Sequence, residues 1–127
     1  MNYRNREALR LKNIRDTKRK VNKAVKRLVK LGINALHCKK VFDSRQCMFS
    51  YAEGYFGKDL TDNYLLINKI TEGKHSTPDT LYILWAGDVT LMCDILADEG
   101  LTVEVPVDDK KTIVVKIDLY GEEDARR

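Results

Sequence analysis

The residues best suited to chemistry in this sequence are cations, and they are concentrated in one stretch. Residues 12–32 contain nine Lys or Arg and a single acid, Asp16. At 100° per residue, six of these cations lie opposite an apolar stripe on a predicted helix, so they can present positive charge to a partner. The six are Lys12, Arg19, Lys23, Lys26, Arg27 and Lys30. The residues predicted to bind that partner are Lys12, Arg15, Arg19, Lys23, Lys26, Arg27 and Lys30.

The spacing of these cations argues against an ordinary solvated helix surface. Cations four residues apart, such as Arg15 with Arg19 and Lys23 with Arg27, repel each other by about 0.2–0.5 kcal/mol per pair. A solvated helix normally mixes both signs of charge. The pattern therefore predicts a negatively charged partner. Nucleic acid or a nucleoprotein is the first interpretation, docking on acidic protein the second, and plain solvation the third.

The distribution of charge along the chain fits the first two interpretations. Residues 1–40 carry a net charge of +12 and residues 41–127 a net charge of −8, within a total of +4. Such an asymmetry favours either an external anion or pairing of a basic segment with an acidic remainder.

Ligand-type side chains are present, but their spacing predicts no metal site. They follow neither a C-x-x-C nor an H-x-x-x-H pattern, and isolated cysteines usually pack in a core. These residues are His37, Cys38, Cys47, His75 and Cys93.

Nothing in the sequence predicts a catalytic centre or a cofactor. Asp43, Glu53 and Asp88 could act as acids or bases, but no nucleophile is paired with them, and carboxylates at helix starts are ordinarily caps. A phosphate-binding loop and a G-x-S-x-G motif are both absent from the sequence. An aromatic group could stack on bases beside the basic helix, although core packing is the commoner fate of such groups. The group comprises Phe42, Phe49, Tyr51, Tyr55 and Phe56.

Composition predicts one soluble domain over residues 1–127, with a basic helix in 1–32 and an acidic α+β body in 33–127. The chain is 43% apolar and 33% charged, which is typical of a globular protein. No run approaches 18 apolar residues, so no membrane span is predicted, and the first ten residues lack the apolar core of a secretory signal. Three widely spaced cysteines favour a reducing, cytoplasmic setting over a disulfide framework.

A long amphipathic helix must position the cations. Apolar residues recur three and four positions apart, and Gly32 followed by Ile33 is typical of a left-handed cap. Starting near Arg4, the helix would have about 28 residues and a length of roughly 42 Å. That length is large for this chain, so we expect part of the helix to project or to pair with a second copy. The apolar stripe comprises Ile14, Thr17, Val21, Ala24, Leu28 and Leu31.

The middle of the chain is predicted to be helical. Asp43 with Gln46 resembles a capping box in front of one helix. Residues 60–73 have Asp62 as a helix start and Gly73 as a stop, so a second helix is expected there. The short apolar run inside this segment suits a helix or a strand.

The C-terminal third predicts a strand–helix–β-hairpin unit. Residues 102–119 alternate apolar and polar side chains around a polar turn, and Pro106 indicates an edge strand. Residues 80–99 suit either one helix or a strand followed by a helix that Asp88 caps. Gly87 and the strand-forming run before it favour the second arrangement. The predicted fold class is α+β.

These patterns predict a small non-enzymatic binding protein, a regulator or inhibitor, that engages nucleic acid or a nucleoprotein complex through its basic helix. Its size and charge would suit a viral or mobile-element protein. One alternative is a protein-only interaction module that dimerises through the helix and binds a basic protein. A second alternative is a small α+β enzyme or ligand-binding protein.

Overall fold

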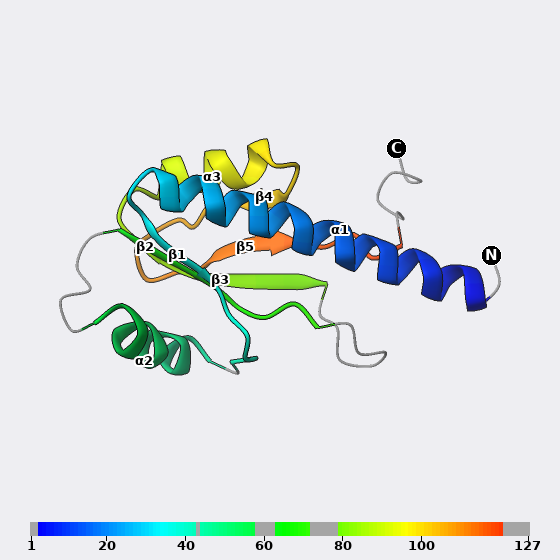
Figure 1. Cartoon of the computed structure of the whole chain (residues 1–127), viewed down its shortest axis with the longest axis horizontal. Helices are drawn as coiled ribbons and strands as arrows, with labels where there is room; N and C mark the ends of the chain where they lie inside the picture. The colour runs from blue at the N-terminus through cyan, green and yellow to red at the C-terminus, as the bar shows by residue number, and fades with distance from the viewer. Residues whose placement is uncertain (1–2, 43, 58–62, 72–78, 121–127) are drawn as a thin grey trace.

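The computed structural model describes residues 3–42, 44–57, 63–71 and 79–120, and these ranges contain three helices and five strands. The helices are α1 (Tyr3–Lys30), α2 (Arg45–Phe56) and α3 (Val89–Asp98). The strands are β1 (Asn34–His37), β2 (Tyr64–Ile67), β3 (Thr80–Ala86), β4 (Thr102–Glu104) and β5 (Ile113–Lys116). All five strands join one sheet with helices packed against it (Figure 1), which confirms the predicted α+β class.

The sheet is mixed and has the strand order β1-β2-β3-β5-β4. β1 runs parallel to β2, whereas the other neighbouring pairs are antiparallel. In the centre, Leu84 of β3 lies opposite Leu66 of β2, and Leu81 of β3 lies opposite Val115 of β5. Both faces of this sheet carry apolar side chains, so both must be covered.

Helices cover the two faces unequally. α1 and α3 lie side by side on one face, and α2 lies on the other (Figure 1). Because successive strand residues point to opposite faces, Ile83 joins the large core under α1 and α3 while Leu84 joins the small core under α2. Ile14 of α1 is buried in the large core, and Met48 of α2 is buried in the small core.

The end of α1 confirms the predicted cap. The N–H of Gly32 donates to the C=O of Val29 at 3.0 Å, and the N–H of Ile33 donates to the C=O of Leu28 at 3.1 Å. Gly32 has a φ of 86°, a left-handed conformation that glycine adopts without steric cost. Ile33 is buried in the large core, so the cap also fixes where the chain enters β1.

Most of the predicted apolar stripe of α1 is buried, but Thr17 is half-buried and Leu31 is exposed. Its fully buried members are Ile14, Val21, Ala24 and Leu28. Leu31, which was predicted to belong to the stripe, is 58% exposed. It follows the last helical residue, so the helical phase no longer determines its direction.

The N-terminal half of α1 extends past the end of the sheet (Figure 1) but is held by the segment after β5. Asn13 Nδ2 donates to the C=O of Leu119 at 2.8 Å, and the Arg6 guanidinium lies 4.3 Å from the centre of the Tyr120 ring. Arg10 is 2% exposed, and its Nη2 lies 2.6 Å from Glu7 Oε1. Hydrogen bonding to a carboxylate is what makes burial of a guanidinium tolerable.

The second helix predicted for the middle of the chain is wrong. Tyr64–Ile67 form β2, an inner strand of the sheet, and all four side chains are buried, two in each core. A strand covered on both faces has apolar residues at every position, so it lacks the alternation that would have identified it. The predicted helix boundaries, Asp62 and Gly73, lie outside the described residues.

The first predicted middle helix is confirmed as α2, but its cap is one residue later than expected. Ser44 Oγ accepts a hydrogen bond from the N–H of Cys47 at 3.1 Å, so Ser44 is the N-cap. Gln46 is then the second helical residue instead of the third, and the predicted capping box with Asp43 does not fit this start. Asp43 itself lies outside the described residues.

The C-terminal unit is confirmed in its preferred form. β3 is followed by Gly87, which has a φ of 106°, and then by α3. Asp88 Oδ1 accepts a hydrogen bond from the N–H of Leu91 at 3.1 Å and caps that helix, so the single-helix alternative is wrong. β4 and β5 form the predicted antiparallel hairpin, and β4 is an edge strand that ends before Pro106.

Candidate nucleic-acid interface

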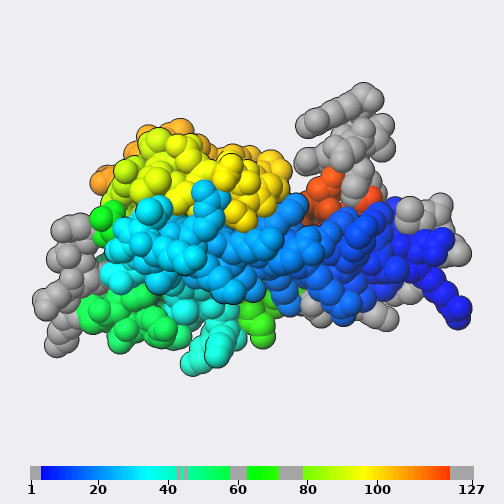
Figure 2. Space-filling model, turned by 45° about the horizontal axis from the view of Figure 1, so that its top comes forward, coloured from blue at the N-terminus to red at the C-terminus, as the bar shows by residue number. Residues whose placement is uncertain are grey.

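Six of the seven predicted binding residues form an exposed surface along α1. The residues of this basic surface are Lys12, Arg15, Arg19, Lys23, Lys26 and Lys30. The opposite side of the helix is fixed against the sheet and α3, so the cations are held on a rigid support. Figure 2 shows α1 running along the length of one face of the molecule, between α3 and the residues that follow β1. The arrangement can bind an extended anion along the helix.

The seventh predicted residue, Arg27, differs from the others because it is paired inside the protein. Its Nη1 lies 2.7 Å from Asp98 Oδ2 and 2.9 Å from Glu99 Oε2. Hydrogen bonds to these two carboxylates raise the pKa of Arg27. The carboxylates stand at the C-terminal end of α3, where negative charge is disfavoured. Arg27 therefore offsets that charge and joins α1 to α3.

One acid lies within the basic surface. Asp16 Oδ1 is 3.3 Å from Arg19 Nη2, and the Arg19 side chain is 64% exposed. A pair this exposed contributes roughly 0–1 kcal/mol. Arg19 can therefore exchange this partner for an external anion at little cost.

A cavity beside the basic surface gathers three further lysines from separate segments. It has a volume of about 360 Å³ and is lined by Lys18, Asn22, His37, Cys38, Lys39 and Lys69. We call it the lysine cavity. Lys18 and Asn22 are one helical turn apart on α1, Lys39 follows β1, and Lys69 follows β2. Within the described ranges, none of the residues that line it is acidic.

His37 is the most unusual group in the lysine cavity. Its Nδ1 lies 3.0 Å from Asn22 Oδ1, which can only accept, so Nδ1 carries the ring proton. Its Nε2 is buried and has no hydrogen-bond partner. Burial, and secondarily the positive charge of Lys18, lower the pKa of His37. The ring is therefore neutral at pH 7, with an unused acceptor.

Sequence reasoning did not find the lysine cavity. His37 and Cys38 were considered as metal ligands only, and Lys18, Lys39 and Lys69 were not singled out. Cys38 donates its backbone N–H to Ile67 C=O at 2.8 Å, which continues the β1–β2 pairing and brings Lys39 near Lys69. No local signal could have pointed to the site, because it depends on the parallel pairing of two short strands, each followed by a lysine.

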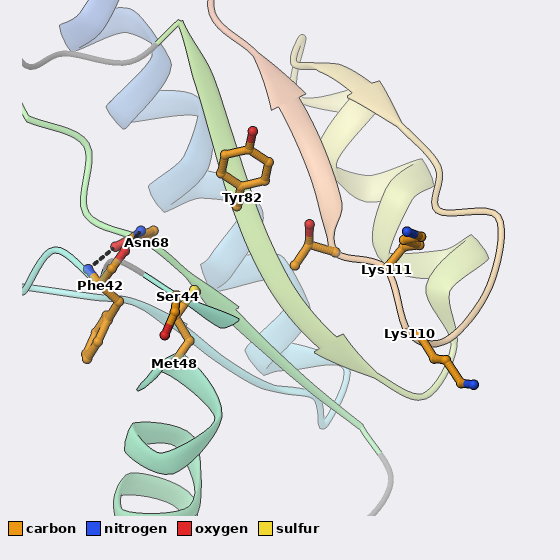
Figure 3. Close-up of a pocket in the computed structure, with 8 residues that line it drawn as sticks. Phe42, Ser44, Met48, Asn68, Tyr82, Lys110 and Lys111 are labelled. Atoms are coloured by element: carbon orange, nitrogen blue, oxygen red, sulfur yellow. Dashed lines mark hydrogen bonds between the residues drawn. The ribbon is translucent and has the colours of Figure 1, made fainter. Parts of the chain in front are cut away.

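A second cavity, of about 350 Å³, lies on the opposite face of the sheet between α2, β3 and the turn before β5. We call it the aromatic cavity. It is lined by Phe42, Ser44, Met48, Asn68, Tyr82 and Thr112, with Lys110 and Lys111 at its rim. Figure 3 shows Lys110 and Lys111 across the cavity from Phe42, with the Lys110 side chain directed away from it.

The polar groups of the aromatic cavity already serve the fold. Asn68 Oδ1 accepts from the Phe42 N–H and its Nδ2 donates to the Phe42 C=O, both at 2.9 Å (Figure 3). Ser44 Oγ caps α2. The Asn68 bonds hold the segment after β1 against the end of β2, so the polar groups of Asn68 and Ser44 are already used by the fold.

The aromatic group predicted as a base-stacking candidate packs on α2 instead. Its rings form a chain of contacts, with centroid distances of 5.0 Å from Phe42 to Tyr51, 6.0 Å from Tyr51 to Tyr55 and 5.1 Å from Tyr55 to Phe56. Phe49 is exposed on the same helix. Because α2 and α1 cover opposite faces of the sheet, these rings do not flank the basic surface.

The candidate metal and acid–base residues are not brought together in the described parts of the chain, where no three His, Cys, Asp or Glu side chains form a group that could hold a metal ion. Cys38 and Cys93 are buried thiols, and burial raises the pKa of Cys38 to about 11. Asp88 is a helix cap. His75 lies outside the described residues.

Among the described residues, no helix is both long enough and apolar enough to cross a bilayer. The function of the chain must be inferred from its own residues, because a scan against protein-family models and searches of curated proteins and of solved structures all returned no match.

Proposed function

We propose that this chain is a non-enzymatic binding protein that holds nucleic acid, alone or within a nucleoprotein complex, on the basic surface of α1. Its role would be to regulate or inhibit such a complex, which suits a small protein that acts by binding. The observation that carries the proposal is the exposure of six cations on one side of a helix whose other side is buried.

The charge pattern favours an external anion over the acids of the chain itself. Arg27 uses its charge on Asp98 and Glu99, whereas Lys23 and Lys26 are exposed on the outer side of the same turns. Repulsion between such neighbours lowers helix stability slightly, and phosphates would remove that cost. Between the two ends of the basic surface α1 rises by roughly 27 Å. A B-DNA duplex of that length carries about 16 phosphate charges, enough for every cation.

The two alternatives find less support. Dimerisation was predicted to use the apolar stripe of α1, but Ile14, Val21 and Leu28 are buried within the chain and are not available to a second copy. An enzyme or small-ligand protein would have to use the aromatic cavity, where Asn68 and Ser44 are already bonded to backbone.

Fluorescence anisotropy with labelled duplex DNA, single-stranded DNA and RNA tests the proposal. If about six phosphates are neutralised, the slope of log affinity against log salt should be near −5 on duplex DNA. The triple variant Lys23→Gln, Lys26→Gln, Lys30→Gln should reduce the magnitude of that slope by about three.

The matched control is Lys110→Gln, Lys111→Gln, Lys116→Gln, which removes the same charge from the far side of the molecule. We expect it to leave the slope nearly unchanged. No binding at low salt, or an equal loss in both triple variants, would overturn the proposal, because equal losses would mean that net charge and not the basic surface determines affinity.

A further inference from the structure

We propose that the lysine cavity is a phosphate-binding site, in which Lys18, Lys39 and Lys69 surround one phosphate group beside the His37 ring. This inference rests on the proposed function, because the phosphate we assign to the site belongs to the backbone of nucleic acid lying on the basic surface.

The composition of the lining supports an anion. Lysine side chains from α1, the segment after β1 and the segment after β2 line one cavity, and the described lining contributes no carboxylate. The charge of Lys18 is near enough to His37 to lower the pKa of the ring. A phosphate in the cavity would attract all three lysine side chains.

The His37 ring provides a group whose charge a nearby phosphate would change. Asn22 fixes the ring through Nδ1, so the ring keeps one orientation beside the cavity. Nε2 is buried and has no partner in the free protein, where the neutral ring leaves it as an acceptor. A phosphate in the cavity would favour the protonated ring by charge attraction.

The position of the cavity connects it to the proposed interface. Lys18 lies one turn from Arg15 along α1, and Asn22 lies one turn from Lys26. A strand whose phosphates follow the basic surface can therefore place a neighbouring phosphate in the cavity. Lys39 and Lys69 are exposed, so they can move toward it without disturbing the core.

The proposed site makes binding depend on pH in a defined direction. The groups that face His37 are Lys18 and Asn22 of α1, Lys39 and the neutral Cys38 thiol after β1, and Lys69 after β2. Phosphate would counter the lysine charges and raise the pKa of His37. Binding then takes up a proton, and affinity should rise as pH falls through the His37 titration.

The first test uses inorganic phosphate and sulfate as ligands, with NMR of the His37 ring as the readout. The chain has two histidines, so a His75→Gln background leaves His37 as the single histidine. Phosphate or sulfate should raise the pKa of His37 by about half a unit or more relative to chloride at equal ionic strength. Lys39→Gln with Lys69→Gln should abolish that rise. Lys110→Gln with Lys111→Gln, at the aromatic cavity, should leave it intact.

The second test uses a short duplex. His37→Gln should remove the increase in affinity between about pH 8 and pH 5.5. Lys39→Gln with Lys69→Gln should weaken binding about tenfold at low salt.

These outcomes separate the two proposals. A His37 pKa that is equal in phosphate, sulfate and chloride would overturn the phosphate site, while salt-dependent DNA binding by α1 would stand. A clear response to phosphate without any binding of nucleic acid would overturn the proposed function and our assignment of the phosphate to nucleic acid. Only a site for free phosphate would then remain.

Discussion

The two flanks of α1 use positive charge in opposite ways. On the flank facing α3, Arg27 is paired with two carboxylates at the end of that helix, and Lys20 Nζ lies 3.5 Å from the C=O of Gly100. On the flank facing the end of β1, Lys18 shares a cavity with Lys39 and Lys69 and with no acid among the described lining residues. Cations of one helix thus stabilise the fold on one side. On the other side, we propose, they bind a partner.

The largest expected effect comes from breaking the attachment of α1, on which both flanks depend. Val21→Asp places a charge at a position with no exposed surface, so we expect a loss of about 3–5 kcal/mol in the free energy of unfolding, measured by urea denaturation. Leu31→Asp is the matched control. It changes an exposed residue and should shift stability by only about 0.5 kcal/mol. Equal urea midpoints for the two variants would show that α1 is not seated as described.

Smaller effects are expected from substitutions of two neighbouring residues of α1, Lys26 and Arg27. Lys26→Gln should reduce the magnitude of the salt slope for DNA by about one, because one phosphate contact is lost, and should leave the melting temperature nearly unchanged. Arg27→Gln should do the reverse: the slope is kept, and the melting temperature falls because the pairs with Asp98 and Glu99 are lost. That fall should shrink at high salt. If Arg27→Gln weakened DNA binding as much as Lys26→Gln, the distinction between the flanks would be lost.

The smallest expected effect is the pH dependence that His37 gives to the free energy of unfolding. His37 lies on the flank of α1 that faces the end of β1. The pKa of His37 is below its ordinary value of 6.5, so the unfolded chain takes up the proton first as pH falls. The stability that neutral His37 contributes is therefore complete above pH 6.5, and it is lost as pH falls from there toward the folded pKa. Urea denaturation of His37→Gln should lack this part of the pH dependence. Identical pH profiles for the two proteins would contradict it.

The elements that were predicted correctly have strong local signals. α1 has a sustained helical period and a glycine cap at Gly32, and the 80–99 segment has a glycine and a capping Asp88 between its strand and helix. β1 was not predicted, and β2 was mistaken for a helix. Each has four residues, which is too short for either period to be recognised. Their parallel pairing joins segments that no local pattern connects.

Only part of the candidate site could be predicted from the sequence, for a related reason. The basic surface follows from spacing on one helix, so it could be proposed from residues 12–30 alone. Whether each cation is exposed or paired depends on the tertiary fold. Arg27 meets Asp98, which is 71 positions away, and no spacing rule connects them. The lysine cavity joins three segments and therefore exists only after β1 and β2 have paired.

The hydrogen bond between Asn13 and Leu119 has a consequence for the order of events during synthesis. The two residues are 106 positions apart. At roughly 5–20 residues per second, a ribosome needs about 5–20 s to make the chain between them. α3, which contacts the apolar side of α1 together with β1, is also made long after the helix. For those seconds the nascent chain carries a cationic helix whose apolar stripe is only partly covered. Part of that stripe is then available to bind other molecules, so correct folding depends on this surface staying unoccupied until α3 has been made.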